Sequence, residues 1–127
     1  STRAPIGQVS MNKVPLCTNQ GCKSLVSKNE NNTKYYFYYF QVQTNVLNML
    51  GRGTTFLELS TTDLNNFILP VPNFDEQNII VSYLDQKCSQ IDNLISIKQQ
   101  KIDELKEYKK SMIYEYITGK KQVETKM

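Results

Sequence analysis

Two loop segments carry the side chains best suited to contact a nucleic acid. The first is a turn pattern, Asn19-Gln20-Gly21, followed by Cys22 and Lys23, and the second is a glycine-rich loop, Gly51-Arg52-Gly53-Thr54-Thr55. Arg and Lys can donate to guanine, and Asn and Gln can pair with adenine. The glycine-rich loop lacks the G-x-x-x-x-G-K-(S/T) spacing of a nucleoside triphosphate site. It could present Arg52 and two hydroxyls to a nucleic-acid backbone, and a plain turn is the alternative.

Catalytic and metal-binding patterns that depend on histidine are missing, because the sequence has no histidine. A Ser-His-Asp or Cys-His nucleophile cannot be built, and neither can the usual His-containing zinc site. The three cysteines, Cys17, Cys22 and Cys88, are an odd number without metal-type pairing and favour a reducing cytoplasm. We expect no catalytic residue, no metal site and no cofactor. No apolar run approaches the roughly 20 residues that cross a bilayer, so we also expect no membrane contact.

Charge and composition divide the 127 residues into two parts, which suits one domain with an appendage. Residues 1–72 carry six Lys or Arg and three Asp or Glu, a net charge of +3, whereas residues 73–127 carry nine of each kind. The first part also holds all four prolines and four of the five glycines. This composition predicts an α+β fold with a small β-rich lobe. The expected short strands are residues 4–9, 14–17, 56–59 and 67–69.

The run of six aromatic residues from Tyr35 to Phe40 fits either a strand or a helix. Aromatic residues favour a strand. The longer segment from Lys34 to Leu50, closed by Gly51, favours a buried amphipathic helix, which is our interpretation. A stacking platform for single-stranded nucleic acid is the alternative role, but such platforms interleave basic groups and only Lys34 flanks this run. The residues at helical spacing are Tyr36, Phe40, Gln43, Leu47 and Leu50.

Residues 73–118 contain no Gly or Pro and have a helical composition. Asn73 can serve as the N-cap, Glu76 falls at the third helical position, and Gly119 ends the helix. Within it, positions that are mostly apolar alternate at spacings of four and three residues, which is a heptad pattern. We call these positions the heptad stripe: Leu84, Cys88, Ile91, Ile95, Lys98, Ile102, Leu105, Lys109, Met112 and Tyr116.

The length of the stripe predicts a coiled coil, because a small lobe could not cover it. We expect a homodimer or a docked partner along this helix, and ordinary intramolecular packing is the alternative. A second capping pattern near residues 86–89 leaves open two helices in series. Residues 119–127 are expected to form a flexible tail.

Several motifs follow one another in an order that resembles a single family across nearly the whole chain. The family is the DNA specificity subunit of type I restriction-modification systems. The similar part is the C-terminal portion of one target-recognition domain plus the conserved spacer helix. The motifs are Arg3 to Gly7, Asn19 to Leu25, Tyr35 to Phe40, Gly51 to Phe56, Leu69 to Pro72 with Glu76-Gln77, Ile79 to Asp85, and the heptad helix closing on Ile117 to Lys120.

The resemblance implies a non-catalytic protein whose recognition domain grips one half of a bipartite duplex DNA sequence. It also implies that a long helix spaces this domain from a second one and docks the methyltransferase and restriction subunits. Residues 1–72 then resemble a partial recognition domain and residues 73–118 the spacer, as in a truncated or half specificity subunit. The competing hypothesis is a coiled-coil oligomerisation or adaptor protein with a protein-binding β-rich lobe. The expected DNA-binding residues are Arg3, Asn19, Gln20, Lys23, Arg52 and Thr54.

Overall fold

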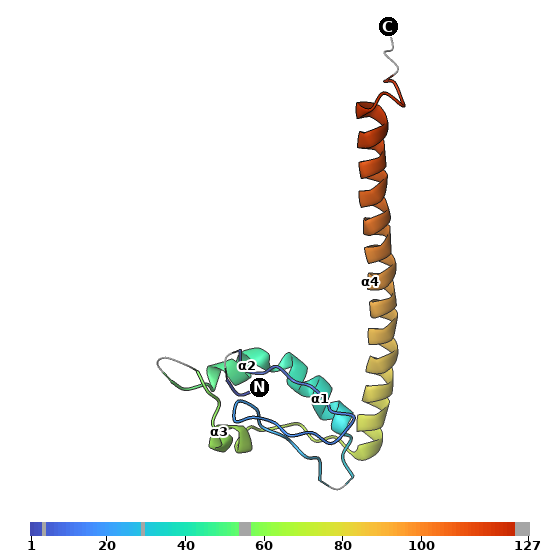
Figure 1. Ribbon diagram of the computed structural model, residues 1–127. Coiled ribbons are helices and arrows are strands. Elements are labelled where there is room, and N and C mark those ends of the chain that lie inside the picture. The colour runs from blue at the N-terminus through green and yellow to red at the C-terminus, as the bar shows by residue number, and fades with distance from the viewer. Residues whose placement is uncertain (4, 29, 54–56, 124–127) are drawn as a thin grey trace. The chain divides into compact units, whose positions relative to one another are not determined.

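The computed structural model describes residues 1–3, 5–28, 30–53 and 57–123. The chain forms two compact units, Ser1–Leu84, which we call the lobe, and Asp85–Met127. The last helix begins in the lobe and continues into the second unit (Figure 1). The helices in the described residues are α1 (Thr33–Val42), α2 (Thr44–Met49), α3 (Thr61–Asn65) and α4 (Phe74–Ile117).

The core of the lobe joins the first two helices, α1 and α2, to two loop segments. Phe40 from α1 and Leu47 from α2 are buried against Ile6 and Leu59, which lie in loops. These four side chains come from positions up to 53 residues apart, so the core holds the loops in place around α1 and α2. The half-buried apolar residues packed around it are Val9, Tyr36, Leu50, Leu64, Phe67 and Leu69.

Hydrogen bonds from α2 fix the N-terminal segment. The Asn48 Nδ2 donates to the carbonyl of Ile6 at 2.9 Å, and the Thr44 hydroxyl donates to the carbonyl of Gly7 at 3.4 Å. Gly7 has a φ of 89°, and a Cβ there would lie 3.0 Å from the Thr44 Cα. Glycine is required at this position because it tolerates both the positive φ and the close backbone. These contacts therefore fix the backbone at Ile6 and Gly7, a few residues after Arg3.

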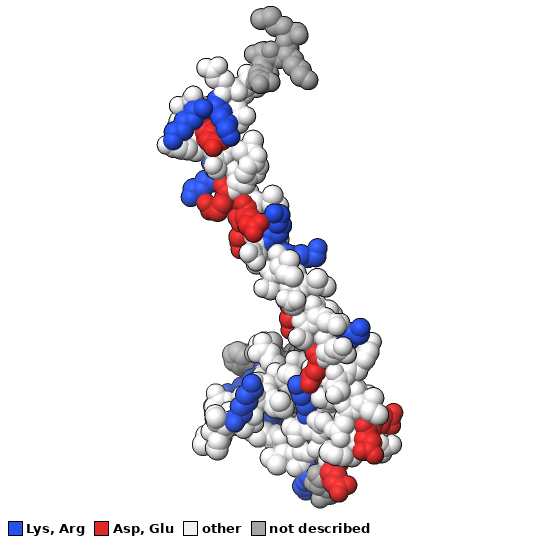
Figure 2. Space-filling view, turned by 90° about the vertical axis from the view of Figure 1, so that its right-hand side faces the viewer, with Lys and Arg blue, Asp and Glu red and all other residues white. Residues whose placement is uncertain are grey.

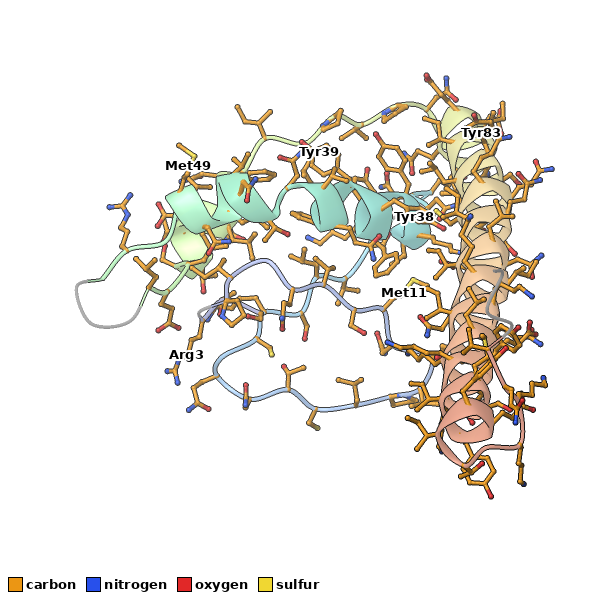
Figure 3. The ribbon with its side chains drawn as sticks, turned by 90° about the horizontal axis from the view of Figure 1, so that it is seen from above. Arg3, Met11, Tyr38, Tyr39, Met49 and Tyr83 are labelled. Atoms are coloured by element: carbon orange, nitrogen blue, oxygen red, sulfur yellow. The ribbon has the colours of Figure 1, made fainter. Side chains whose placement is uncertain are left out.

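The prediction of a helix in the aromatic region is confirmed, although the helix is interrupted. α1 and α2 meet at Gln43, whose backbone N–H bonds the carbonyl of Phe40 at 3.2 Å. Asn32 caps α1 by accepting from the Lys34 N–H at 2.9 Å. Tyr39, labelled in Figure 3, has its ring centroid 6.5 Å from that of Phe67. The aromatic run therefore packs within the lobe.

The predicted limits of the long helix are also confirmed. The Asn73 side chain accepts from the Glu76 N–H at 2.9 Å, which is the expected N-cap bond. Gly119 follows the end of the helix with a φ of 74°, as a left-handed cap residue does. α4 runs through residues 86–89 without interruption, so one helix and not two in series is observed. Its 44 residues span about 66 Å at roughly 1.5 Å per residue.

Gln77 ties the first turn of α4 to the start of α1. Its side chain is 1% exposed. Its Oε1 accepts from the Asn32 N–H at 2.8 Å, and its Nε2 donates to the carbonyl of Pro72 at 2.8 Å. The Asn32 Nδ2 also donates to the Asn78 Oδ1 at 2.7 Å. Both helix starts therefore share one set of hydrogen bonds.

The prediction of a β-rich lobe, and with it the α+β class, is wrong. The described residues contain no named strand, only isolated antiparallel bridges that join Arg3 and Arg52 to Glu58. Strand propensity describes how a side chain fits a sheet, and it produces a strand only where a second strand can pair. The proline-flanked segments of this lobe lack donors at the prolines. The lobe is instead helical, with α1, α2 and α3 linked by irregular loops.

Candidate nucleic-acid interface

Two of the predicted basic residues, Arg3 and Arg52, are brought together by Glu58. The Arg52 N–H donates to the Glu58 carbonyl at 3.0 Å, and the Glu58 N–H donates back to the Arg52 carbonyl at 2.9 Å. On the other side, the Leu59 N–H donates to the carbonyl of Thr2 at 2.8 Å. The Arg3 Nε lies 3.6 Å from the Glu58 carboxylate. Residues 49 positions apart in the sequence thus lie on opposite sides of one short segment.

The predicted turn of residues 19–22 lies against Arg3. The Asn19 Oδ1 accepts from the Gly21 N–H at 3.0 Å, and the Gly21 carbonyl accepts from the Thr2 N–H at 2.8 Å. A Cβ on Gly21 would lie 3.5 Å from the Arg3 Cδ. We call Arg3, Arg52, Glu58 and residues 19–22 the arginine cluster. It contains four of the six predicted DNA-binding residues.

The remaining two predicted residues are placed less fully. Lys23 directly follows the turn and is exposed. Thr54 lies outside the described residues. Arg3, which Figure 3 shows at the edge of the lobe, is also exposed, as are Asn19 and Gln20. All five placed residues therefore reach solvent, as contact with a macromolecule requires.

An acidic residue that the sequence analysis did not select holds the guanidinium of Arg52. The Arg52 Nη2 donates to the Asp63 Oδ1 at 2.9 Å. The other oxygen of Asp63 accepts from the Ser60 hydroxyl at 2.7 Å, and the Ser60 Oγ accepts from the Asp63 N–H at 3.0 Å. Ser60-x-x-Asp63 is a capping-box pattern of the kind that begins α3. That pattern could have located Asp63, but its proximity to Arg52 depends on the fold.

The side chains of the arginine cluster limit the chemistry that it can offer. Its titratable side chains are two arginines, one glutamate and the half-buried Cys22. In the part of the chain that the structure describes, no three His, Cys, Asp or Glu side chains gather as metal ligands would. What the cluster offers is hydrogen-bond donors: two guanidinium groups and the amides of Asn19 and Gln20.

The heptad stripe forms an exposed apolar face on the second unit. Ile95 is 59% exposed and Leu105 is 55% exposed, and Lys98 and Lys109 are exposed beside them. Leu84, at the end of the lobe, is half-buried. Other apolar residues of this helix outside the predicted stripe are exposed too: Leu94, Ile97, Tyr108 and Ile113. A face this apolar along one helix is suited to packing against a protein.

The polar side of the same helix is held by local ion pairs. Lys101 lies 2.9 Å from Glu104, and Lys106 lies 3.0 Å from Asp103. Hydrogen bonds from Lys106 and from Gln99 hold the pKa of the Asp103 carboxyl below its ordinary value of 3.8. Figure 2 shows acidic and basic side chains lying close together along this unit. These pairs neutralise one another and leave the apolar face as the distinctive surface.

The described residues include no helix that is both long enough and apolar enough to cross a bilayer. This holds for α4 as well, because charged residues recur along its whole length.

Comparison with known proteins identifies the family. The family model of the type I restriction modification DNA specificity domain matches residues 1–123. The chain therefore belongs to this family, and the resemblance noted from its motifs is confirmed. The match includes both the arginine cluster and the heptad stripe.

Individual relatives carry the same description. The chain is 31% identical, over 98% of its length, to a putative type I restriction enzyme specificity subunit, MjaX, of Methanocaldococcus jannaschii. It is 35% identical over 79% of its length to the MjaIX specificity subunit of the same organism. It is 26% identical over 78% of its length to the EcoBI specificity subunit of Escherichia coli. The chain spans only 29%, 23% and 21% of these relatives, respectively.

Proposed function

We propose that this chain is a DNA-recognition module of a type I restriction-modification specificity subunit. It contributes recognition and no catalysis, and it acts in the cytoplasm. The observation that carries this proposal is the family match over residues 1–123, which includes an exposed group of arginine and amide side chains. The competing idea of an adaptor with a protein-binding lobe has no comparable support.

Residues 1–72 form the part that contacts duplex DNA. Positive side chains on this part, which has a net charge of +3, meet phosphates and release counterions. Lys23 acts in this way. The arginine and amide donors of the arginine cluster reach base edges, where Arg selects guanine and Asn or Gln selects adenine.

Residues 73–118 form the spacer and docking helix. The exposed heptad stripe packs against a second helix, either in another copy of this chain or in the methyltransferase and restriction subunits that the full complex requires. The two stripe lysines, Lys98 and Lys109, fix the register of that pairing, since a charge at a core position tolerates few arrangements.

A salt titration tests the proposed function. Fluorescence anisotropy of the full chain with a labelled duplex is measured between about 50 and 200 mM salt, where phosphate contacts weaken binding along a straight log–log line. We expect duplex binding with such a slope. Binding to protein alone, insensitive to salt and without duplex affinity, would instead support the adaptor hypothesis.

A pair of lysine variants separates a phosphate contact of Lys23 from the effect of the net charge of the chain. Lys23→Ala should reduce the salt slope by about one unit and weaken all duplexes alike. Lys101→Ala removes the same charge from the second unit and should leave the slope unchanged.

A pull-down of the purified methyltransferase subunit by the full chain tests the docking helix separately. If the chain does not retain the methyltransferase subunit, docking is refuted and the DNA-binding result is unaffected.

A further inference from the structure

Arg52 is restrained at more points than an exposed side chain normally is. Its backbone is bonded on both sides to Glu58, at 3.0 and 2.9 Å. Its guanidinium is bonded to Asp63 at 2.9 Å, although the side chain remains 79% exposed. Asp63 is in turn only 17% exposed and is fixed by the Ser60 hydroxyl at 2.7 Å. The result is a flexible residue held in one orientation while facing solvent.

The ion pair between Arg52 and Asp63 contributes little to the stability of the fold. An ion pair with one partner in water contributes little, because solvent screens the charges and ordering a long side chain costs entropy. The capping of α3 does not require Arg52 either, since Ser60 and Asp63 complete that cap between themselves. A fixed and exposed donor is, however, what specific recognition requires, because an ordered group loses less freedom on binding.

We propose that Asp63, held by Ser60, is a positioning residue that orients the Arg52 guanidinium to read a guanine in the major groove. The inference rests on the proposed function, that the lobe binds duplex DNA. A guanidinium has five N–H donors in a planar fork. The bond to Asp63 engages Nη2, and a neighbouring pair of donors in the same plane suits the O6 and N7 acceptors of guanine.

The charge of Asp63 gives the proposal a distinctive signature. A carboxylate beside the DNA surface repels phosphates, so it lowers binding to every duplex while it improves the orientation of Arg52. Its removal should therefore raise general affinity and reduce base preference. A residue that only supported the fold would change both in the same direction, together with thermal stability.

The test uses the full chain and a pool of duplexes with a randomised central window. Bound and unbound duplexes are sequenced, which gives the preference for guanine at each position. General affinity is measured by anisotropy with one duplex of random sequence. Asp63→Asn keeps an oxygen that can accept the Ser60 hydrogen bond but removes the charge that orients Arg52. It should reduce the guanine preference at one position about tenfold, with equal or tighter binding of the random duplex.

Two further variants make the result specific. Arg52→Lys keeps the positive charge and leaves the α3 cap untouched, yet it should lose the same preference, because an ammonium cannot form the two parallel bonds. Asp75→Asn is the matched control. It makes the same substitution at an exposed position of the lobe outside the arginine cluster, and it should leave the guanine preference intact.

Each result leads to a separate conclusion. If the unmodified chain binds no duplex, the proposed function fails and the inference falls with it. If the chain shows a base preference that Asp63→Asn or Arg52→Lys retains, the inference alone is overturned. A parallel loss of preference, general affinity and melting temperature in Asp63→Asn would also overturn it, in favour of a structural role.

Discussion

Replacing Gln77 should show how strongly the lobe depends on the bonds at the base of α4. The side chain is 1% exposed and makes bonds of 2.8 Å to both the Asn32 N–H and the Pro72 carbonyl. Gln77→Leu keeps the approximate size but removes both partners. A buried polar group without a partner costs about 1–3 kcal/mol. Two such groups give an expected loss of about 2–6 kcal/mol, a large part of the stability of a small domain.

Gln77→Glu adds a pH-dependent form of the same test. The carboxyl introduced at position 77 could still accept from the Asn32 N–H, but it would face the Pro72 carbonyl and needs a proton to donate to it. Burial and this neighbouring acceptor favour the neutral acid in the folded state, so its pKa should exceed the ordinary value of about 4.3. The variant should therefore approach the wild type in acid and lose stability as the pH rises above that value.

The assay is urea unfolding followed by the near-ultraviolet circular dichroism of the tyrosines, four of which lie in α1. Gln100→Leu makes the same substitution at an exposed position of α4 and should change the free energy of unfolding by less than about 0.5 kcal/mol. A Gln77→Leu variant as stable as this control would refute the reasoning. So would a Gln77→Glu variant whose deficit does not depend on pH.

Three other perturbations have defined outcomes. Gly7→Ala should cost about 1–3 kcal/mol in urea unfolding, because Gly7 has a φ of 89°, and an unchanged midpoint would contradict this. Ile102→Glu should convert a self-associated chain into monomers in sedimentation, whereas Gln100→Glu should not; a strictly monomeric unmodified chain that binds no partner would refute the pairing proposal. Because its hydrogen-bond partners hold the pKa of Asp103 below 3.8, its stabilising effect should be present above that pH and lost in stronger acid. Far-ultraviolet circular dichroism should show this acid-induced loss of helix reduced in Asp103→Asn, and an identical transition in both proteins would contradict it.

The residues proposed for the candidate site can be selected from the sequence, but their arrangement in space cannot. Arg3, Asn19, Gln20 and Arg52 are selected by side-chain chemistry and by their positions in loops, which the sequence shows directly. That they form one cluster depends on Glu58, whose backbone lies between the two arginines. Glu58 and Asp63 could not be predicted as members of the site, because a carboxylate is repelled by DNA phosphates and is not an expected DNA contact. Their roles exist only through neighbours that the fold brings to them.

Local signals were sufficient for the long helix. Asn73 at its start, the absence of Gly and Pro through residue 118, and Gly119 at its end act through neighbouring backbone groups, so the sequence by itself determined those limits. The amphipathic spacing of the aromatic region also predicted helix from the sequence alone. Strands need a partner from elsewhere in the chain, and only the tertiary structure decided that segments such as residues 14–17 have none among the described residues. The same reason applies to Gln77, because it bonds a residue 45 positions away and only folding brings the two together.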